Sequence, residues 1–376
     1  MSILSADKSL RYGYTTGACA AAGVKAVLLK QQGEPWQQVK LKALDGTELS
    51  IPIAAVQSGE EGGETAEVIK FSGDDPDITN GTSVFTTLRP IESSGEIVFR
   101  AGLGVGTITK PGLSVSVGEP AINPGPRQLI RSVLEEMTDS SCGWEVTISI
   151  PEGIELAKKT LNPVLGIEGG ISVIGTTGVL RPMSEEAFKE SLVPQIDVAI
   201  SAGFDSLVFV PGKIGEKVAM SWGLPAGALI QTSNFIGFML EAAAKRGVRQ
   251  VMLFGHIGKM AKVAAGVFYT HNRIGDARLE TIAAYAAAEG LSSEAVGRVL
   301  AANTTEDALA VLSVWQPGFC RRVCDVIAQR ASVRAERYLF NQLEVGTVMV
   351  TLTGELLGLD EKAKVIGEAQ GWKMPQ

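Results

Sequence analysis

The chain has 376 residues, 45% apolar and 20% charged, a composition typical of a folded protein and not of a disordered one. Its length predicts two domains with sizeable cores. A formal net charge of −7 argues against a general nucleic-acid-binding protein, although local cations can still bind an anionic small molecule.

The termini and cysteines predict a cytoplasmic protein. No basic start followed by an apolar core is visible at the amino terminus, and no apolar run approaches the length of a membrane span. Cys19, Cys142, Cys320 and Cys324 are too few and too scattered for a disulfide framework. Buried reduced thiols are favoured over a metal site, and no protein metal site is expected.

Residues 1–155 predict an α+β domain with a mixed sheet. A helix rich in alanine covers Ala18–Leu29, with Thr15 or Thr16 as its cap, and the small side chains favour close approach to a sheet. Strand patterns follow at Val39–Ala43, Leu49–Ile53, Ala66–Phe71, Ser83–Pro90, Glu96–Arg100 and Trp144–Ile150, with a further helix at Gln128–Met137. Asp45-Gly46 predicts a hairpin between the first two strands.

Two polar stretches of this domain resemble ligand loops only in part. The acidic spacing in Gly73–Gly81 suggests a calcium loop, but the residue eleven positions after Asp75 is Thr86 and not glutamate, so a rigid turn is favoured. The glycines of Gly102–Gly112 lack the following helix of a dinucleotide fingerprint. Two ordered loops, Gly102–Gly112 with Lys110 and Val117–Arg127 with Arg127, fit better.

Residues 156–335 predict a Rossmann-like, mostly parallel α/β domain. Four apolar segments are each followed by a Gly, Ser or Asn turn and a helix: Gly169–Gly178, Ser206–Val210, Ala228–Thr232 and Val251–Phe254. Turns at the carboxyl ends of parallel strands share one edge of a sheet, so we expect one pocket there. Residues 336–376 are expected to form a strand and tail that pack back on the core.

The turn after the fourth segment, Gly255–Lys259, attracts most interest. Gly255 and Gly258 can turn backbone amides toward a ligand at the start of a helix. The chain has two histidines, and both His256 and His271 lie in or shortly after this turn. An ordinary strand–helix turn with a packed histidine is the structural alternative.

Several longer motifs occur in order between about residues 11 and 278. They are Arg11–Ala22, Gly73–Gly81, Thr109–Leu113, Val117–Pro124, Leu161–Ser172, Gly175–Gly178 with Pro182–Ala187, Ser233–Gly237 and Gly255–Lys259. Together they resemble the cobalt-precorrin-5B C1-methyltransferase family of anaerobic cobalamin biosynthesis, CbiD. Lys213 and Ile214 stand where this family usually has Asn-Tyr, and Gln231-Thr232 where Lys-Cys is common.

The resemblance implies transfer of a methyl group from S-adenosyl-L-methionine to C1 of cobalt-precorrin-5B, giving cobalt-precorrin-6A. Cobalt would enter only as part of the corrinoid substrate. Such a transfer relies on proximity and orientation, and the electron-rich macrocycle is itself the nucleophile. His256 is the candidate catalytic residue, because its intrinsic pKa near neutrality suits proton uptake.

The motif loops also supply candidate binding residues. For S-adenosylmethionine they are Gly175, Thr176, Thr177, Gly178, Gly255 and Gly258. For the acetate and propionate groups of the corrinoid they are Lys110, Arg127, Arg181, Ser233, Asn234, Lys259, His271 and Arg278.

Two other functions remain open. A nicotinamide-dependent reductase of corrinoid precursors predicts an acid about twenty residues after the turn. Glu280 lies near that position but follows a loop. The other is a non-catalytic corrinoid-binding or channelling protein. In each case the partner is a small molecule, not a nucleic acid or a membrane, and a homo-oligomer is left open.

Overall fold

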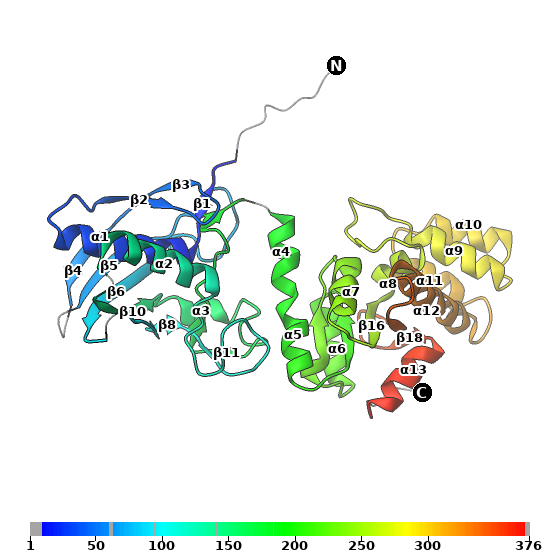
Figure 1. Ribbon diagram of the computed structural model, residues 1–376. Helices are drawn as coiled ribbons and strands as arrows, with labels where there is room; N and C mark the ends of the chain where they lie inside the picture. The colour runs from blue at the N-terminus through cyan, green and yellow to red at the C-terminus, as the bar shows by residue number, and fades with distance from the viewer. Residues whose placement is uncertain (1–9, 60–62, 94, 140, 183, 373–376) are drawn as a thin grey trace, which may run out of the picture. The chain divides into compact units, whose positions relative to one another are not determined.

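The computed structural model describes residues 10–59, 63–93, 95–139, 141–182 and 184–372 (Figure 1). It confirms the α/β class. Contacts divide the chain into two compact units, Met1–Glu185 (unit 1) and Glu186–Gln376 (unit 2). Each unit has its own sheet and is described separately.

Unit 1 contains the predicted mixed sheet. In spatial order its strands are β4 (Ala55–Ser58), β5 (Glu64–Ile69), β6 (Ser83–Ile91), β10 (Gly143–Ser149) and β7 (Ile97–Ala101). The pair β10–β7 is parallel and the other pairs are antiparallel. The strand β4 was not predicted from the sequence.

Helix α1 (Thr16–Gln31) packs closely on this sheet and on α2 (Pro124–Met137). Thr15 is the N-cap, and its hydroxyl accepts the N–H of Ala18 over 3.2 Å. A Cβ added to Gly23 would lie 2.9 Å from Cβ of Thr86 on β6, so small residues permit the approach. The predicted cap and close helix–sheet contact are both confirmed.

The predicted turns of unit 1 also form. Strands β2 (Gln38–Lys42) and β3 (Glu48–Pro52) pair as a hairpin around Gly46. In the Gly73–Gly81 segment, the carboxylate of Asp77 lies 2.7 Å from Nζ of the buried Lys70 and accepts the N–H of Thr79. Among the residues that the structure describes, no cluster of three or more His, Cys, Asp or Glu could hold a metal ion.

The boundary between the units lies at 185/186 instead of 155/156. The segment between these two boundaries is held in unit 1 by three short strand pairs. They are β1 (Gly13–Tyr14) with β13 (Val179–Leu180), β8 (Gly104–Val105) with β12 (Gly170–Ile171), and β9 (Thr107–Ile108) with β11 (Ile167–Glu168). Helix α3 (Gly153–Ala157) runs across the expected boundary. The interpretation of Gly169–Gly178 as a strand of the parallel sheet was therefore wrong. Gly169 and Gly175 adopt positive φ, which breaks the apolar run.

Unit 2 contains the predicted parallel sheet. In spatial order its strands are β15 (Leu229–Gln231), β14 (Ser206–Val210), β16 (Gln250–His256), β17 (Glu344–Val350) and β18 (Leu356–Leu359). The first four are parallel and β18 is antiparallel. Since β15 and β16 lie on opposite sides of β14, the strand order reverses there. Ligands bind at such a reversal, outside the carboxyl ends of the strands.

Helices cover both faces of this sheet. A Cβ on Gly346 of β17 would lie 2.4 Å from the backbone of α13 (Glu361–Ala369), whereas one on Gly358 of β18 would lie 2.6 Å from the backbone of α12 (Phe319–Tyr338). Gly346 shares its side of the sheet with Val348 and Val350, and Gly358 is on the other side.

The chain after Asp276 is largely helical, as predicted. Over residues 184–372 the helices are α4 (Glu185–Leu192), α5 (Pro194–Ser201), α6 (Lys213–Ser221), the 3₁₀ turn η2 (Ala226–Ala228), α7 (Ile236–Lys245), α8 (Ile257–Ala264), α9 (Arg278–Ala288), α10 (Ser293–Leu300), α11 (Thr305–Ser313), α12 (Phe319–Tyr338) and α13 (Glu361–Ala369), of which α9 to α13 follow Asp276. None of the helices in the described part of the chain is long and apolar enough to cross a bilayer.

Candidate functional site

A pocket of about 440 Å³ opens in unit 2 beside the carboxyl end of β16. Its walls come from the turn after β15, the start of α8, the segment that follows α8, and the first residue of α9. The lining residues are Asn234, His256, Gly258, Lys259, Lys262, Thr270, His271, Asn272, Arg273 and Arg278. The structure thus brings together most of the candidates predicted in this unit.

Lys259 connects three turns at this edge of the sheet. Its Nζ donates to Asn234 Oδ1 over 2.7 Å, to the Pro211 carbonyl over 3.1 Å and to the Ser233 carbonyl over 3.3 Å. Pro211 follows β14, Ser233 and Asn234 follow β15, and Lys259 follows β16. Burial, together with the smaller effect of the positive charge of Lys262, lowers the pKa of Lys259 to about 8.

Ser233 has an unusual backbone conformation at this point. Its φ of 53° lies in the left-handed region, which is unfavourable for residues with a Cβ. Strained residues of this kind persist where surrounding contacts hold them, and they concentrate at functional sites. Here the bond from Lys259 to the Ser233 carbonyl is such a contact.

His256 is the N-cap of α8. Its Nδ1 accepts the N–H of Gly258 over 3.1 Å, so a neutral ring carries its proton on Nε2. Nε2 lies 2.7 Å from Oε1 of Glu306, close enough for an ion pair but not aligned for a hydrogen bond. Burial alone would raise the pKa of Glu306, but its backbone N–H, Thr305 and His256 together outweigh burial and lower it.

Lys262 is a member of the site that the sequence interpretation missed. It is only 1% exposed, and its Nζ donates to Asn272 Oδ1 over 2.6 Å and to the Thr270 carbonyl over 3.1 Å. Burial lowers its pKa, Asp276 opposes this effect and Arg278 reinforces it. The spacing of three residues from Lys259 places both lysines on one side of α8 and could have identified it.

The remaining contacts arrange the mouth of the pocket. Arg278 forms a bidentate pair with Asp276, at 2.6 Å from Nε and 2.7 Å from Nη2. This pairing lowers the pKa of Asp276. His271 Nδ1 accepts the N–H of Arg273 over 3.2 Å, which fixes the turn that carries both residues.

The pocket is positively charged, in contrast to the chain as a whole. Lys259, Lys262, Arg273 and Arg278 line it, whereas Asp276 and Glu306 pair with lining residues. A cationic pocket suits a ligand that carries several carboxylates.

Three of the predicted substrate-binding cations lie in unit 1. Lys110 Nζ donates to the Val164 carbonyl over 3.2 Å, and the exposed Arg181 lies 3.4 Å from the carboxylate of Asp45. Lys110 and Arg181 do not line the pocket of unit 2. They also do not line a second pocket, which lies in unit 1 and includes Arg127 among its lining residues.

The turn Gly175–Gly178 also belongs to unit 1, and it packs around the start of α1. The Thr15 N–H donates to the Gly178 carbonyl over 2.9 Å, and the Gly17 N–H donates to the Ile174 carbonyl over 3.0 Å. A Cβ on Gly175 would lie 2.2 Å from the Thr15 hydroxyl. The expectation that this turn shares one sheet edge with Gly255–Gly258 was wrong. Cofactor binding by Gly175, Thr176, Thr177 and Gly178 stays a prediction.

Lys213 and Ile214, which replace the usual family residues, lie on the first turn of α6. Both are exposed, and neither is among the residues that line the pocket. Glu306 is the other residue that sequence reasoning missed. It lies fifty positions after His256, on a different helix, and no local pattern connects the two.

Comparison with known proteins gives a consistent result. The CbiD family model matches residues 3–182, and the model of the CbiD C-terminal domain matches residues 269–361. A relative from Moorella thermoacetica named cobalt-precorrin-5B C(1)-methyltransferase is 49% identical, covering 96% of this chain and 97% of its own length. A relative of the same name from Methanocaldococcus jannaschii is 43% identical, covering 93% and 96%.

A solved structure is also similar. It is the crystal structure of the cobalamin biosynthesis protein (cbiD) from Archaeoglobus fulgidus, which is 27% identical and has a TM-score of 0.37. The match covers 72% of this chain and 84% of that one. The family models and the near-full-length relatives together show that the chain belongs to the CbiD family.

Proposed function

We propose that this chain is an enzyme that transfers a methyl group from S-adenosyl-L-methionine to C1 of cobalt-precorrin-5B, giving cobalt-precorrin-6A. The observation that carries the proposal is the identity, over nearly the whole chain, with relatives named for this methyl transfer. The predicted methyl donor and product extend beyond those names and are part of the proposal.

The pocket of unit 2 is the proposed substrate site. Acetate and propionate groups of the corrinoid would pair with Lys262 and Arg278, with Asn234 and His271 as further polar contacts, and the charge of Lys259 would add attraction. Lys259 is already tied to three turns, so its main effect would be to hold the pocket in shape. Lys262 uses two of its three N–H donors within the protein, which leaves one for a carboxylate.

We place the methyl donor near the turn Gly255–Gly258. Transfer breaks its bond between sulfur and methyl carbon, forms a bond from that carbon to C1, and leaves the electron pair on sulfur. Gly258 lines the pocket, but its N–H is bonded to His256. Gly258 would therefore offer the donor close backbone approach and not a hydrogen bond.

Proton uptake by His256 stays a prediction. The bond from Gly258 to Nδ1 and the proximity of Glu306 to Nε2 favour a positioning role instead. A cytoplasmic location also stays a prediction, and the oligomeric state stays open.

An anaerobic assay tests the function. The purified chain is supplied with cobalt-precorrin-5B and S-adenosylmethionine carrying a ¹³C-methyl group, and the product is examined by NMR. We expect the label at C1, and Lys262→Met should slow its appearance relative to the exposed control Lys245→Met. Absence of label in the presence of folded protein and both substrates would refute the proposal.

A further inference from the structure

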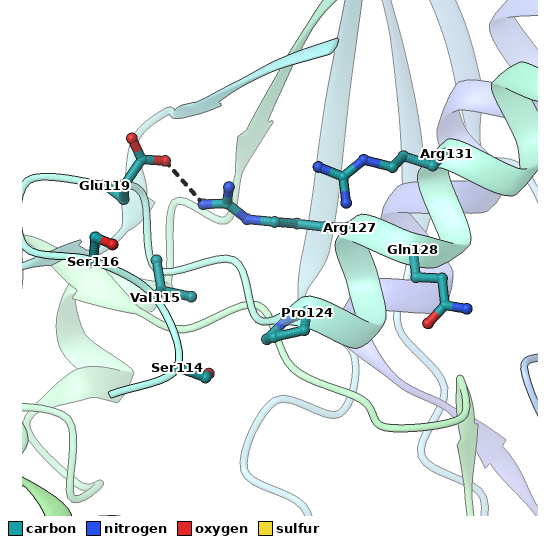
Figure 2. A pocket seen from close by; sticks show the side chains of 8 residues that line it. All are labelled: Ser114, Val115, Ser116, Glu119, Pro124, Arg127, Gln128 and Arg131. Carbon is teal, nitrogen blue, oxygen red and sulfur yellow. Dashed lines mark hydrogen bonds and ion pairs between the residues drawn. The ribbon is translucent and has the colours of Figure 1, made fainter. Parts of the chain in front are cut away.

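We propose that unit 1 carries a separate binding site for a carboxylate-bearing ligand, in a pocket between α2 and the loop of residues 114–119. The pocket has a volume of about 590 Å³. Figure 2 shows Arg127 and Arg131 projecting from α2 toward one side, with Glu119 and Ser116 on the facing loop. All of its lining residues belong to unit 1.

The two arginines are held over one aromatic ring. They are four residues apart on α2, which places them on the same side of the helix. The guanidinium carbons of Arg127 and Arg131 lie 5.1 and 5.5 Å from the ring centre of Phe99, which is itself buried. The ring face attracts both cations and orients them, although two like charges at this spacing repel each other.

The partners of the two guanidinium groups differ. Arg127 donates through Nε to the Ile122 carbonyl over 2.8 Å, and through Nη2 to the Pro120 carbonyl and Glu119, each over 3.2 Å. Arg131 has no hydrogen bond or ion pair with any residue that the structure describes. Arg127 is thus fixed by the protein, whereas all donors of Arg131 remain available.

This arrangement matches the chemistry of carboxylate recognition. A guanidinium can bind a carboxylate through two parallel N–H donors, and Arg131 presents these donors next to a second cation that it repels. A bound anion would relieve that repulsion. The side-chain amide of Gln128, which also lines the pocket, supplies a further donor.

In the proposed reaction, two molecules could supply the carboxylate. The choice between them therefore rests on the proposed function. One is the set of acid side chains of the corrinoid. The other is the amino-acid carboxylate of the methyl donor. The site itself requires only the shared chemistry.

Calorimetric titration of the full chain tests the site and separates the sources. The probes are cobyrinic acid, in which the corrinoid side chains are carboxylates, cobinamide, in which they are amides, and S-adenosylhomocysteine. Arg131→Gln should weaken binding of one carboxylate probe by about tenfold, as expected for a lost charge-assisted hydrogen bond. Arg298→Gln removes a charge from an exposed position on α10 and should leave all affinities unchanged.

The outcomes are distinct. Weaker binding of cobyrinic acid with unchanged cobinamide assigns the site to the corrinoid, and weaker binding of S-adenosylhomocysteine assigns it to the donor. Unchanged binding of both, or an equal loss in Arg298→Gln, overturns the site. Methyl transfer by the unmodified chain is measured in parallel. If methyl transfer is absent but Arg131→Gln still shows its specific loss of binding, the proposed function is refuted and the proposed site is supported.

Discussion

Lys259 donates a hydrogen bond to Asn234 Oδ1 over 2.7 Å, and this bond joins the helix after β16 to the turn after β15. The same Nζ reaches the Pro211 carbonyl after β14. One side chain therefore holds the carboxyl ends of three parallel strands in register with one another, at the position where the strand order reverses. The shape of the pocket in unit 2 depends on this lysine.

Lys259→Met should destabilise the protein by about 1 kcal/mol, because three acceptors lose their donor while water partly replaces it in this half-buried position. Urea unfolding measures the change. Lys213→Met, at an exposed position on α6, is the matched control and should stay within about 0.5 kcal/mol of the unmodified chain. Equal stability of both variants would show that the three contacts contribute little.

The pKa of Lys259 predicts opposite pH trends for stability and binding. Burial lowers this pKa from 10.5 to about 8, so between these values the unfolded chain binds more protons than the folded one. Stability should therefore rise with pH across this window. In the proposed site the charge of Lys259 attracts carboxylates, so affinity for cobyrinic acid should fall as pH rises through about 8. Unfolding and titration measured from pH 7 to 10.5 test both trends, and Lys259→Met should lack them.

Sequence patterns identified unit 2 well because its strands are buried on both faces and read as continuous apolar runs. Ser206–Val210 is such a run, and it is the strand β14 without any change in its bounds. The pattern at Gly169–Gly178 looked the same. It failed because an apolar run does not reveal whether glycines at positive φ interrupt it, or which partner strands are available.

The residues of the candidate site also divide into those that the sequence revealed and those that it did not. His256, Lys259 and Arg278 were accessible from the sequence because they lie in or near one turn and its following helix. Glu306 was not, because its contact with His256 depends on how α11 packs in three dimensions. Lys262 was overlooked because a lysine on a helix is usually solvated, and nothing local indicates that it is 1% exposed.

Lys262→Met should loosen the segment that carries His271 and Arg273. The Thr270 carbonyl and Asn272 lose the donor that ties them to α8, so amide hydrogen exchange across residues 270–276 should become faster. Mass spectrometry of proteolytic peptides locates the change. Lys245→Met, at the exposed end of α7, should not alter exchange in this segment. Unchanged exchange in Lys262→Met would show that other contacts hold the segment.

Substitutions at His256 distinguish capping from proton transfer. His256→Ala removes the acceptor for the Gly258 N–H and should cost about 1 kcal/mol of stability, together with a loss of turnover as the start of α8 loosens. His256→Asn keeps a side-chain acceptor at the N-cap but cannot titrate near neutrality. Because Nδ1 is already engaged and Nε2 faces Glu306, we expect the Asn variant to recover both stability and most of the turnover. Urea unfolding and the anaerobic methyl-transfer assay measure the two properties side by side. A stable Asn variant with a large loss of turnover would contradict the positioning role and would instead support proton uptake by His256.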